Sequence, residues 1–542
     1  MRTPCDEAVI LSAPAFTRCR EQSAPWILTA TILASSMAFI DSTVVNVALP
    51  TLQTSFHATL VDAQWVVEAY GMFLSALIIT GGVLGDLYGR RRMFLAGVFI
   101  FAAASAVCGM ASSISELVVA RAVQGVGAAL LVPGSLALIS ASFDEKTRGQ
   151  AIGTWSGYTG MMTAGGPVLG GWLIQHASWR WTFLINLPLA AAVLVISLLH
   201  VPESRRSGPK KPYDWMGAVA VTLGLTGIVK GFLDSTSKGW AAPSVLLSLS
   251  LGFVFLLVFL VLQNRVDSPM IPLAMFRSPG FAGASLLTLF LYAALGIFFF
   301  LFPMNLIQVH GYSVAAAGAA GLPMILLMFF LSRWSGGLIA RYPAKLPLTV
   351  GPLIVAVGFL LFTRPSTTGS YWSTFFPAFL VLGFGMATTV APLTTFALSS
   401  VDLDHAGVAS GINNAIARVA GVLAIAVMGI VMVSAFTLRM DHSMESIPHP
   451  PEVLDYIHSN ATRLASMDLP PPRISSAAQL DADTTSAIRA AVSHAFVFGF
   501  RIVMVICAGL ALISSAVALL VIPSGLQKRE SPAPHQDQVA RI

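Results

Sequence analysis

The 542-residue sequence is 56% hydrophobic and only 10% charged, with a formal net charge of +6. Soluble globular domains carry about 25% charged residues, so this composition excludes a soluble domain and indicates a membrane protein with many spans. Apolar runs of about twenty residues predict membrane helices, because the strands of a membrane barrel alternate over only about ten residues. The positive charge falls in short loops, which predicts contact with a lipid bilayer and no nucleic-acid partner.

Residues 1–25 mix charged residues with prolines and are expected to form a disordered cytoplasmic tail. Fourteen apolar runs follow, each close to the roughly 20 residues that cross a bilayer. Their approximate limits are 26–49, 64–85, 92–112, 117–141, 150–174, 181–201, 215–235, 243–263, 280–303, 314–335, 347–363, 374–397, 408–436 and 495–522. The predicted fold class is an all-α polytopic membrane protein with 14 spans.

Positive charge alternates between the two sets of loops that these spans would create. The set that begins with the arginines at 90–92 is rich in lysine and arginine, and the other set is poor in both. Because lysine and arginine concentrate in cytoplasmic loops, the rich set is assigned to the cytoplasm. The sequence therefore predicts a multi-pass protein of the cell (inner) membrane with both termini cytoplasmic.

An internal repeat occurs at a spacing of about 258 residues, which is the separation of Gly125 from Gly383. It aligns the fourth and fifth apolar runs with the twelfth and thirteenth. Parallel repeats of this kind flank the substrate site in many secondary transporters. We therefore expect two six-helix bundles joined by an inserted two-helix hairpin and followed by a cytoplasmic tail. The expected limits are 26–201 for the first bundle, 202–279 for the hairpin with its cytoplasmic linkers, 280–523 for the second bundle and 524–542 for the tail.

One loop on the predicted outer side, residues 437–494, is much longer than the others. Val453, Ile457, Ala461 and Leu464 recur there at helical spacing between clusters of prolines. This pattern is typical of a short amphipathic helix on the outer face, and a tolerated surface insertion is the alternative. A periplasmic adaptor protein is a candidate partner for this loop.

Asp41 is the one ionisable residue of the first apolar run. A carboxylate inside a bilayer is costly, so such residues usually face a protein interior or a wet cavity; the alternative is a residue near a helix end that reaches water. Glu68 in the second run and Arg121 in the fourth fall at similar depth, in the outer half of the membrane. Two acids and one base at that depth predict a proton site. Gln124 lies on the same helix face as Arg121 and is a candidate hydrogen-bond partner or substrate contact.

The loop between the second and third runs has the sequence GVLGDLYGRRR, over residues 82–92. Gly82 and Gly89 permit a tight turn and close helix approach. Asp86 is suited either to cap the following helix or to pair with an arginine across a gate, and Arg90 and Arg91 add positive charge. We predict that this segment is a cytoplasmic gate loop.

Several stretches together resemble the major facilitator superfamily, and more closely its fourteen-span drug:proton antiporters of the EmrB/QacA type. They are the loop above, DSTVVNVALP at 41–50, QWVVEAYGM at 64–72, RAVQGVGAA at 121–129, GPVLGG at 166–171, WRWTFLINLP at 179–188 and AGVASGINNAIARVAG at 406–421. The resemblance covers residues 26–523. It implies two six-helix bundles that rock about a central cavity and export solute against proton entry, and it is almost silent on the substrate.

The resemblance also implies roles for single residues. It assigns Arg121 to proton coupling and places Asn46 and Gln124 in the substrate cavity. The stretch GPVLGG resembles the antiporter motif, in which a kink seals the interface between the halves, and its residues here are Gly166, Pro167, Gly170 and Gly171. Two positions depart from the family pattern: Glu68 replaces a small hydroxyl residue, and Met162 replaces a glycine.

Other kinds of chemistry have no support in the sequence. There is no G-x-x-x-x-G-K-[ST] loop for ATP, and the histidines and cysteines show no metal-ligand spacing. We therefore expect no enzymatic activity, metal or cofactor, and proton motive force as the energy source. The predicted function is proton-coupled efflux of small, amphipathic, drug-like compounds by a monomer. The alternatives are a dedicated exporter of one metabolite, such as an antibiotic or a siderophore, and a non-transporting sensor.

Overall fold

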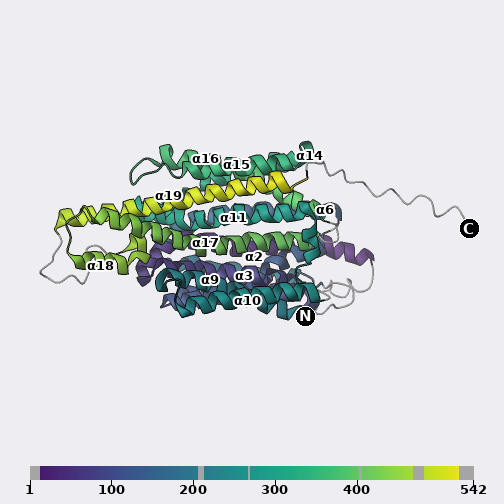
Figure 1. Ribbon diagram of the computed structural model, residues 1–542. Helices are drawn as coiled ribbons and strands as arrows, with labels where there is room; N and C mark the ends of the chain where they lie inside the picture. Colours follow the sequence, from purple (N-terminus) through teal and green to yellow (C-terminus); the bar gives the residue numbers. More distant parts are fainter. Residues whose placement is uncertain are drawn as a thin grey trace, which may run out of the picture.

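The computed structural model describes residues 13–143, 145–204, 213–266, 269–401, 406–467 and 481–523. These residues form helices and no strands, so the all-α prediction is confirmed. The long helices run side by side along one axis (Figure 1). We name the two ends of this axis after short helices that lie there: the α18 end, with α18 (Pro451–Ser459), and the α14 end, with α14 (Leu338–Arg341).

We call the helices α2 to α8 the N-half and those from α11 to α19 the C-half. The N-half contains α2 (Ala13–Phe56), α3 (Leu60–Tyr88), α4 (Arg90–Met110), α5 (Ile114–Ser142), α6 (Glu145–His176), α7 (Trp181–Leu184) and α8 (Asn186–His200). Between the halves come α9 (Trp215–Lys238), α10 (Pro243–Arg265) and η1 (Leu273–Arg277). The C-half contains α11 (Pro279–Met304), η2 (Asn305–Val309), α12 (Val314–Ala319), α13 (Leu322–Gly336), α14, α15 (Lys345–Leu361), α16 (Tyr371–Ser399), α17 (Ala406–Met444), α18, η4 (Ala461–Ser466) and α19 (Ala482–Val521).

Twelve helical segments of the described residues are long and apolar enough to cross a membrane. Helix α15 is a shorter apolar helix of 17 residues. Helix α6 has 32 residues and covers the fifth apolar run, but it is not among the twelve. The protein is therefore polytopic, and the count of fourteen spans stays a prediction that depends on α6 and α15.

Helix limits differ from the expected ones near the start of the chain and around the long loop. Helix α2 begins at Ala13, so the disordered tail expected over residues 1–25 is wrong for residues 13–25. Helix α17 continues to Met444, and α19 begins at Ala482. The Asp481 side chain accepts a hydrogen bond from the Thr484 N–H at 2.8 Å, which caps α19. The start of α19 is therefore set by this capping hydrogen bond and not by the point at which the sequence becomes less hydrophobic.

The long loop contributes to the packed core at the α18 end. Helix α18 confirms the expected amphipathic helix over residues 451–459, and its Val453 and Ile457 are buried. Segment η4 follows, with Leu464 buried, and lies against α2 and α3 of the N-half as well as α17 and α19 of the C-half. For these residues the alternative of a mere surface insertion is wrong, because their apolar side chains belong to a buried cluster that contains residues of both halves.

The two halves share one apolar core at the α18 end. Leu49 of α2 and Leu60 of α3 belong to the same cluster as Phe298 of α11. Toward the α14 end, Phe94 of the N-half and Phe281 of the C-half belong to separate clusters. Since buried apolar area is what holds packed helices together, the halves are closed against each other at the α18 end.

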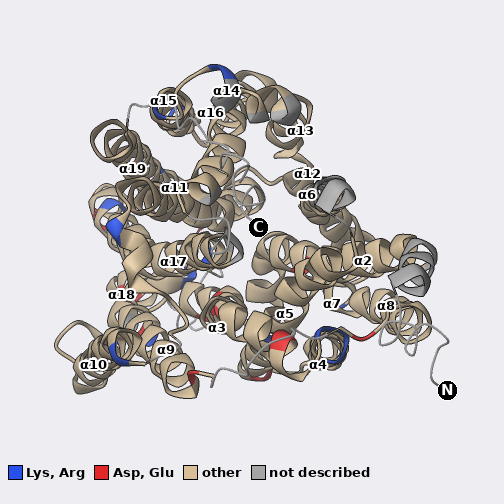
Figure 2. Ribbon diagram, turned by 90° about the vertical axis from the view of Figure 1, so that its right-hand side faces the viewer, with Lys and Arg blue, Asp and Glu red and all other residues tan. Residues whose placement is uncertain are grey.

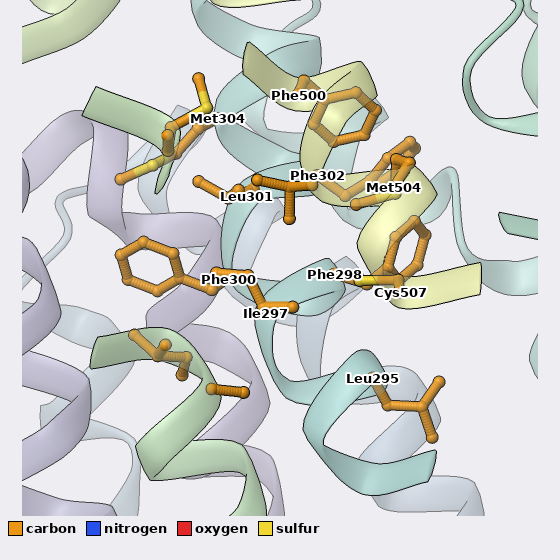
Figure 3. Close-up of a cluster of buried hydrophobic side chains, with 14 of the residues drawn as sticks. Leu295, Ile297, Phe298, Phe300, Leu301, Phe302, Met304, Phe500, Met504 and Cys507 are labelled. Atoms are coloured by element: carbon orange, nitrogen blue, oxygen red, sulfur yellow. The ribbon is translucent and has the colours of Figure 1, made fainter. Parts of the chain in front are cut away.

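Aromatic and sulfur-containing side chains fill the C-half core where α11 meets α19. Figure 3 shows Phe298, Leu301 and Phe302 of α11 beside Phe500 and Met504 of α19. The Phe298 and Phe302 ring centroids lie 5.2 Å apart, within the range of favourable aromatic pairs. These phenylalanines are buried packing residues.

Helices α9 and α10 pack against each other, and α9 also lies along α3 and α17. Figure 2, which looks along the helices, shows this pair at one flank of the molecule. The Tyr213 hydroxyl, just before α9, donates to the Thr80 hydroxyl of α3. Burial raises the pKa of Tyr213 to about 12, so the phenol keeps the proton that it donates. This places α9 across the line where α3 of the N-half meets α17 of the C-half.

Glycines at matching positions of the sequence repeat make matching helix contacts. A Cβ atom at Gly127 of α5 would lie 3.0 Å from the carbonyl oxygen of Gly97 in α4. A Cβ atom at Gly385 of α16 would likewise lie 3.0 Å from the carbonyl oxygen of Gly351 in α15. Small residues let helix backbones approach closely in membranes. The repeat therefore has a physical basis, in that each copy needs glycine for the same close helix pair.

Candidate functional site

The structure brings Asp41 of α2 and Arg121 of α5 into direct contact. The Arg121 Nη1 donates to Asp41 Oδ2 in an ion pair, and the two side chains are 1% and 0% exposed. Asp41 lies midway along α2, between Ala38 of the N-half cluster and Val45 of the shared core. The alternative of a residue near a helix end that reaches water is therefore wrong for Asp41.

Side-chain amides surround this ion pair. Gln124 Nε2 donates to Asp41 Oδ1 at 2.9 Å, and Gln124 Oε1 accepts from Arg121 Nη1 at 2.7 Å. Asn186 of α8 donates from Nδ2 to Asp41 Oδ1 at 3.3 Å and to the Ser105 hydroxyl of α4 at 3.0 Å. Four helices of the N-half, α2, α4, α5 and α8, thus contribute to one polar network. We call Asp41, Arg121, Gln124, Asn186 and Ser105 the Asp41 network.

Arg121 makes further contacts with α3. Its Nε donates to the Val66 carbonyl oxygen at 3.1 Å, and its guanidinium carbon lies 4.2 Å from the centroid of the Tyr70 ring. The planar guanidinium suits several acceptors and an aromatic face at the same time. A buried ion pair is tolerated only when such additional hydrogen bonds satisfy it, and here they do. The arrangement is electrically neutral as long as neither Asp41 nor Arg121 changes its charge.

Glu68 does not join the Asp41 network. Val66 and Tyr70 lie four residues apart on one face of α3 and contact Arg121, and Glu68 lies between them in sequence, on a different face. Glu68 is fully buried, and neither carboxylate oxygen has a hydrogen-bond partner. The structure therefore unites two of the three charged residues predicted to form one proton site.

Asn46 lies on α2, five residues beyond Asp41, and is half-buried. Its Nδ2 lies 3.5 Å from the Ser42 carbonyl oxygen, and its Oδ1 has no hydrogen-bond partner. This oxygen is itself buried in the conformation described here. Its role in a substrate cavity stays a prediction.

The predicted gate loop forms the turn between α3 and α4. Gly89 has φ +114°, a conformation that favours glycine. Asp86 pairs with Arg90 four residues on, with Nη2 to Oδ1 at 2.8 Å. The N-terminus of α4 is bound instead by Glu203, which accepts from the Arg91 N–H at 3.0 Å. Among the residues that the structure describes, Asp86 neither caps α4 nor pairs with a residue of the C-half. Gly82 packs near Pro133 of α5.

The predicted antiporter motif lies between α2 and α12. A Cβ atom at Gly170 would lie 2.6 Å from Val44 of α2, and one at Gly171 would lie 2.7 Å from the Ala315 Cα atom of α12. A Cβ atom at Gly166 would likewise meet the Thr43 hydroxyl of α2. Helix α6 thus presents this stretch to both halves. By contrast, Gly153, Gly157, Gly160 and Gly165 of the same helix have no described atom within 4 Å of a Cβ position.

The partners of Asp41 and of α4 include residues that our sequence reasoning did not assign. Asn186 and Ser105 complete the Asp41 network, Tyr70 supports Arg121, and Glu203 caps α4. A signal existed for Asn186, because an amide inside an otherwise apolar run is costly unless it is bonded within the protein. Ser105 and Glu203 gave no such signal.

Metal and cofactor sites are not apparent in the part of the chain that the structure describes. No group of three or more histidine, cysteine, aspartate or glutamate side chains there is placed to hold a metal ion. The Asp41 network is the polar cluster that contains the buried ion pair. That network can hold or release charge but contains no nucleophile activated by a base.

The geometry and the sequence motifs agree with one known family. The sequence model of the Major Facilitator Superfamily matches residues 31–425. The chain belongs to the Major Facilitator Superfamily. It is thus a membrane-embedded transporter and not an enzyme.

Curated relatives in this superfamily cover most of the chain. The tetracenomycin C resistance and export protein of Streptomyces glaucescens is 33% identical over 503 residues, which is 91% of each chain. The multidrug resistance protein Stp of Mycobacterium tuberculosis is 33% identical over 427 residues, covering 78% of this chain and 79% of its own. The cephamycin export protein CmcT of Amycolatopsis lactamdurans is 32% identical over 410 residues, covering 74% and 84%.

Solved structures share the fold at lower identity. A bacterial homolog to the human lysosomal transporter Spinster, in an inward-facing and occupied conformation, superposes with a TM-score of 0.61 at 19% identity. The match covers 94% of this chain and 99% of the other. At this identity the likeness shows the fold alone.

Proposed function

We propose that this superfamily member is a drug:proton antiporter that exports small amphipathic compounds by alternating access. The observation that carries the proposal is the fully buried Asp41–Arg121 ion pair, held by Gln124 and Asn186 at mid-depth of the N-half. The names of its relatives, which describe resistance and export, support the direction and class of the transport.

Asp41 is the proton-binding group in this mechanism. Protonation removes its negative charge, which leaves Arg121 without its counter-ion in a low-dielectric site. Breaking one partner of a buried ion pair costs about 3–5 kcal/mol. Protonation of Asp41 would therefore favour a conformation in which water or substrate reaches Arg121, and Asn46 and Gln124 would then contact the substrate.

The second feature that the mechanism uses is the closure of the molecule at the α18 end. The two halves share their core there, while their clusters are separate toward the α14 end. We infer that the α18 end faces the outside, that both termini lie in the cytoplasm and that the protein resides in the inner membrane. The gate loop at Asp86, Arg90 and Arg91 would then lie on the cytoplasmic side.

We further propose fourteen spans, with α6 and α15 added to the twelve and with α9 and α10 as the inserted hairpin. Helices α6 and α15 each pack extensively against established spans, namely α2 for α6, and α16 and α19 for α15. Each bundle would then hold six spans. We propose a monomer; the apolar face of α18 is buried within the protein and is not free to bind an adaptor protein.

The energetics allow this coupling without ATP or a cofactor. One charge that crosses a membrane potential of 100 mV releases about 2.3 kcal/mol. A tenfold concentration gradient requires about 1.4 kcal/mol. One proton per cycle is therefore sufficient for more than a tenfold gradient of a neutral substrate.

Dye efflux in inverted vesicles, with and without a pH gradient, tests the proposal. We expect uncoupler-sensitive transport in the natural protein and loss of at least tenfold in Asp41→Asn. Glu445→Gln, which changes an exposed carboxylate, is the matched control. Because Asp41→Asn leaves Arg121 unpaired, the double variant Asp41→Asn/Arg121→Gln checks that loss of transport is not loss of folding. Uncoupler-insensitive efflux, or full activity in Asp41→Asn, would contradict the proposal.

A dedicated exporter of one antibiotic is the second candidate. The tetracenomycin C and cephamycin proteins are named for single compounds, and they are as similar to this chain as the multidrug protein. A panel of chemically unrelated compounds separates the two functions. Resistance confined to one scaffold would favour the dedicated exporter, and resistance across cationic and aromatic scaffolds would favour the multidrug exporter.

A further inference from the structure

Glu68 differs from Asp41 in that no described group forms a hydrogen bond or an ion pair with its carboxyl group. Asp41 accepts hydrogen bonds from Arg121, Gln124 and Asn186. Glu68 is 0% exposed, and both of its oxygens lack a hydrogen-bond partner. An unpartnered carboxylate anion in such a place is far more costly than the neutral acid. In the conformation described here, the neutral acid is the form that the surroundings accommodate.

The position of Glu68 on α3 places it between the two halves. Gln64, one turn before it, donates from Nε2 to the Ile425 carbonyl oxygen of α17 at 2.7 Å. Gly71, one turn after it, approaches Val422 of α17, since a Cβ atom there would lie 3.0 Å from Val422 Cγ2. Residues three or four apart share a helix face. Glu68 therefore lies in the seam between α3 and α17, bracketed by two close contacts.

Helix α9 closes the outer flank of this seam. Met72 of α3, Leu225 and Val229 of α9, and Val422 and Ala426 of α17 form one buried cluster. The seam is thus sealed from lipid by α9 and from water by the contacts on either side of Glu68. Glu68 lies eight residues into α3, which is about 12 Å from the α18 end of that helix.

The charged groups on the surrounding helices do not neutralise Glu68. On α17 the nearest charged residue is Arg418, one turn or about 6 Å along the helix from Val422, and no hydrogen bond joins it to Glu68. On α9, Lys230 and Lys238 both bond to Asp234. The titratable groups within two turns of Glu68 on α3 itself are Asp62 and Tyr70, and others on neighbouring helices include Asp41 of α2, Arg121 of α5 and Tyr292 of α11. None of these described groups forms an ion pair or hydrogen bond with Glu68.

We propose that Glu68 is a proton-binding site separate from Asp41, and that its occupancy is tied to closure of the α3–α17 seam. When the halves part at the α18 end, water reaches the carboxyl, which releases its proton to the solvent. When the halves close, the carboxylate must first take up a proton from that solvent. Acid on the α18 side then favours the closed state, so the proton gradient acts on the gate as well as on Asp41. The inference rests on the alternating-access function proposed above.

Distances between spin labels across the α18 end measure the predicted linkage. The labels are placed at Ser55 in the N-half and Thr368 in the C-half, both exposed, after Cys5 and Cys19 are replaced by serine. In the natural protein we expect the open population to grow as the pH rises, by up to about tenfold per pH unit because one proton is linked to closure. Glu68→Gln mimics the protonated acid, so it should stay closed at every pH.

Two further variants make the outcome decisive. Glu116→Gln, an exposed carboxylate at the same end, should keep the natural pH response. Asp41→Asn removes the other proton-binding group, and the pH response that remains in this variant is the one we assign to Glu68. The proposal is overturned if Glu68→Gln opens with pH as the natural protein does, or if the response is lost in Asp41→Asn and kept in Glu68→Gln. Neither result depends on drug efflux, so failure here is distinct from failure of the proposed antiport.

Discussion

At the scale of single residues, two buried carboxyl sites of the N-half, Asp41 and Glu68, have opposite surroundings. Asp41 has a counter-ion and two amide donors, whereas Glu68 has none. Both are fully buried. The Asp41 site accommodates a carboxylate anion because Arg121 balances its charge. The Glu68 site accommodates the neutral carboxylic acid because no described group there balances a negative charge.

Replacement of Arg121 by lysine tests the need for a guanidinium. Arg121 contacts Asp41, Gln124 and the Val66 carbonyl at once, over the Tyr70 ring. A lysine ammonium is a compact point charge, so it does not reproduce the set of contacts that the planar guanidinium makes. We expect Arg121→Lys to lower efflux at least tenfold with normal protein yield, and Arg439→Lys, which alters a partly solvated arginine over Phe498, to keep it. Wild-type transport by Arg121→Lys would show that only the charge matters.

At the scale of elements, glycine has different roles along α6. Gly166, Gly170 and Gly171 permit contact with α2 and α12, while the glycines from Gly153 to Gly165 meet nothing described within 4 Å. Among its described glycines, α6 is therefore closely packed along the antiporter stretch, residues 166–171, and not before it. Helix α12 also has a glycine at this contact, because Gly318 lies close to the Pro167 carbonyl oxygen of α6.

Alanine substitutions along α6 test this division. A Cβ atom at Gly171 would lie 2.7 Å from a backbone atom of α12, which has little room to move. Overpacking of this kind costs typically about 1–3 kcal/mol. We expect Gly171→Ala to lower the thermal unfolding temperature of purified protein and to reduce efflux, and Gly157→Ala to change neither. Equal effects of the two substitutions would argue against a contact between α6 and α12.

At the scale of the whole molecule, the halves are held together at the α18 end by more than apolar packing. Gln308 Nε2 of η2 donates to Gln53 Oε1 of α2 at 2.9 Å, directly across the two halves. Segment η4 covers the same region and contacts helices of both halves. The alternating access that we propose requires these contacts to break, because substrate would be released through the α18 end.

Cross-linking tests whether this end moves. A short reducible thiosulfonate cross-linker between Gln53→Cys and Gln308→Cys, with Cys5 and Cys19 replaced by serine, should abolish efflux, and a reductant should restore it. The matched control joins Thr288→Cys of α11 to Asn413→Cys of α17, whose natural side chains bond at 2.7 Å within the C-half. That pair should transport when cross-linked. Unchanged efflux with the first pair cross-linked would exclude opening at the α18 end.

The sequence by itself determined the helical membrane class, the superfamily and the Asp41–Arg121–Gln124 site. The class and the site follow from local quantities: hydropathy over about twenty residues, the cost of a charge in a bilayer and helix-face spacing. The superfamily follows from the resemblance of several sequence motifs to its members.

Only the tertiary structure decided which way Glu68 faces and what covers it. Depth along a helix follows from counting residues, but the direction of a side chain depends on how each helix is rotated against its neighbours. Val66 and Tyr70 turn one face of α3 toward Arg121, and that rotation turns Glu68 into the seam with α17. Asn186 joined Asp41 for the same reason, because α8 comes beside α2 and α4 only in the folded bundle.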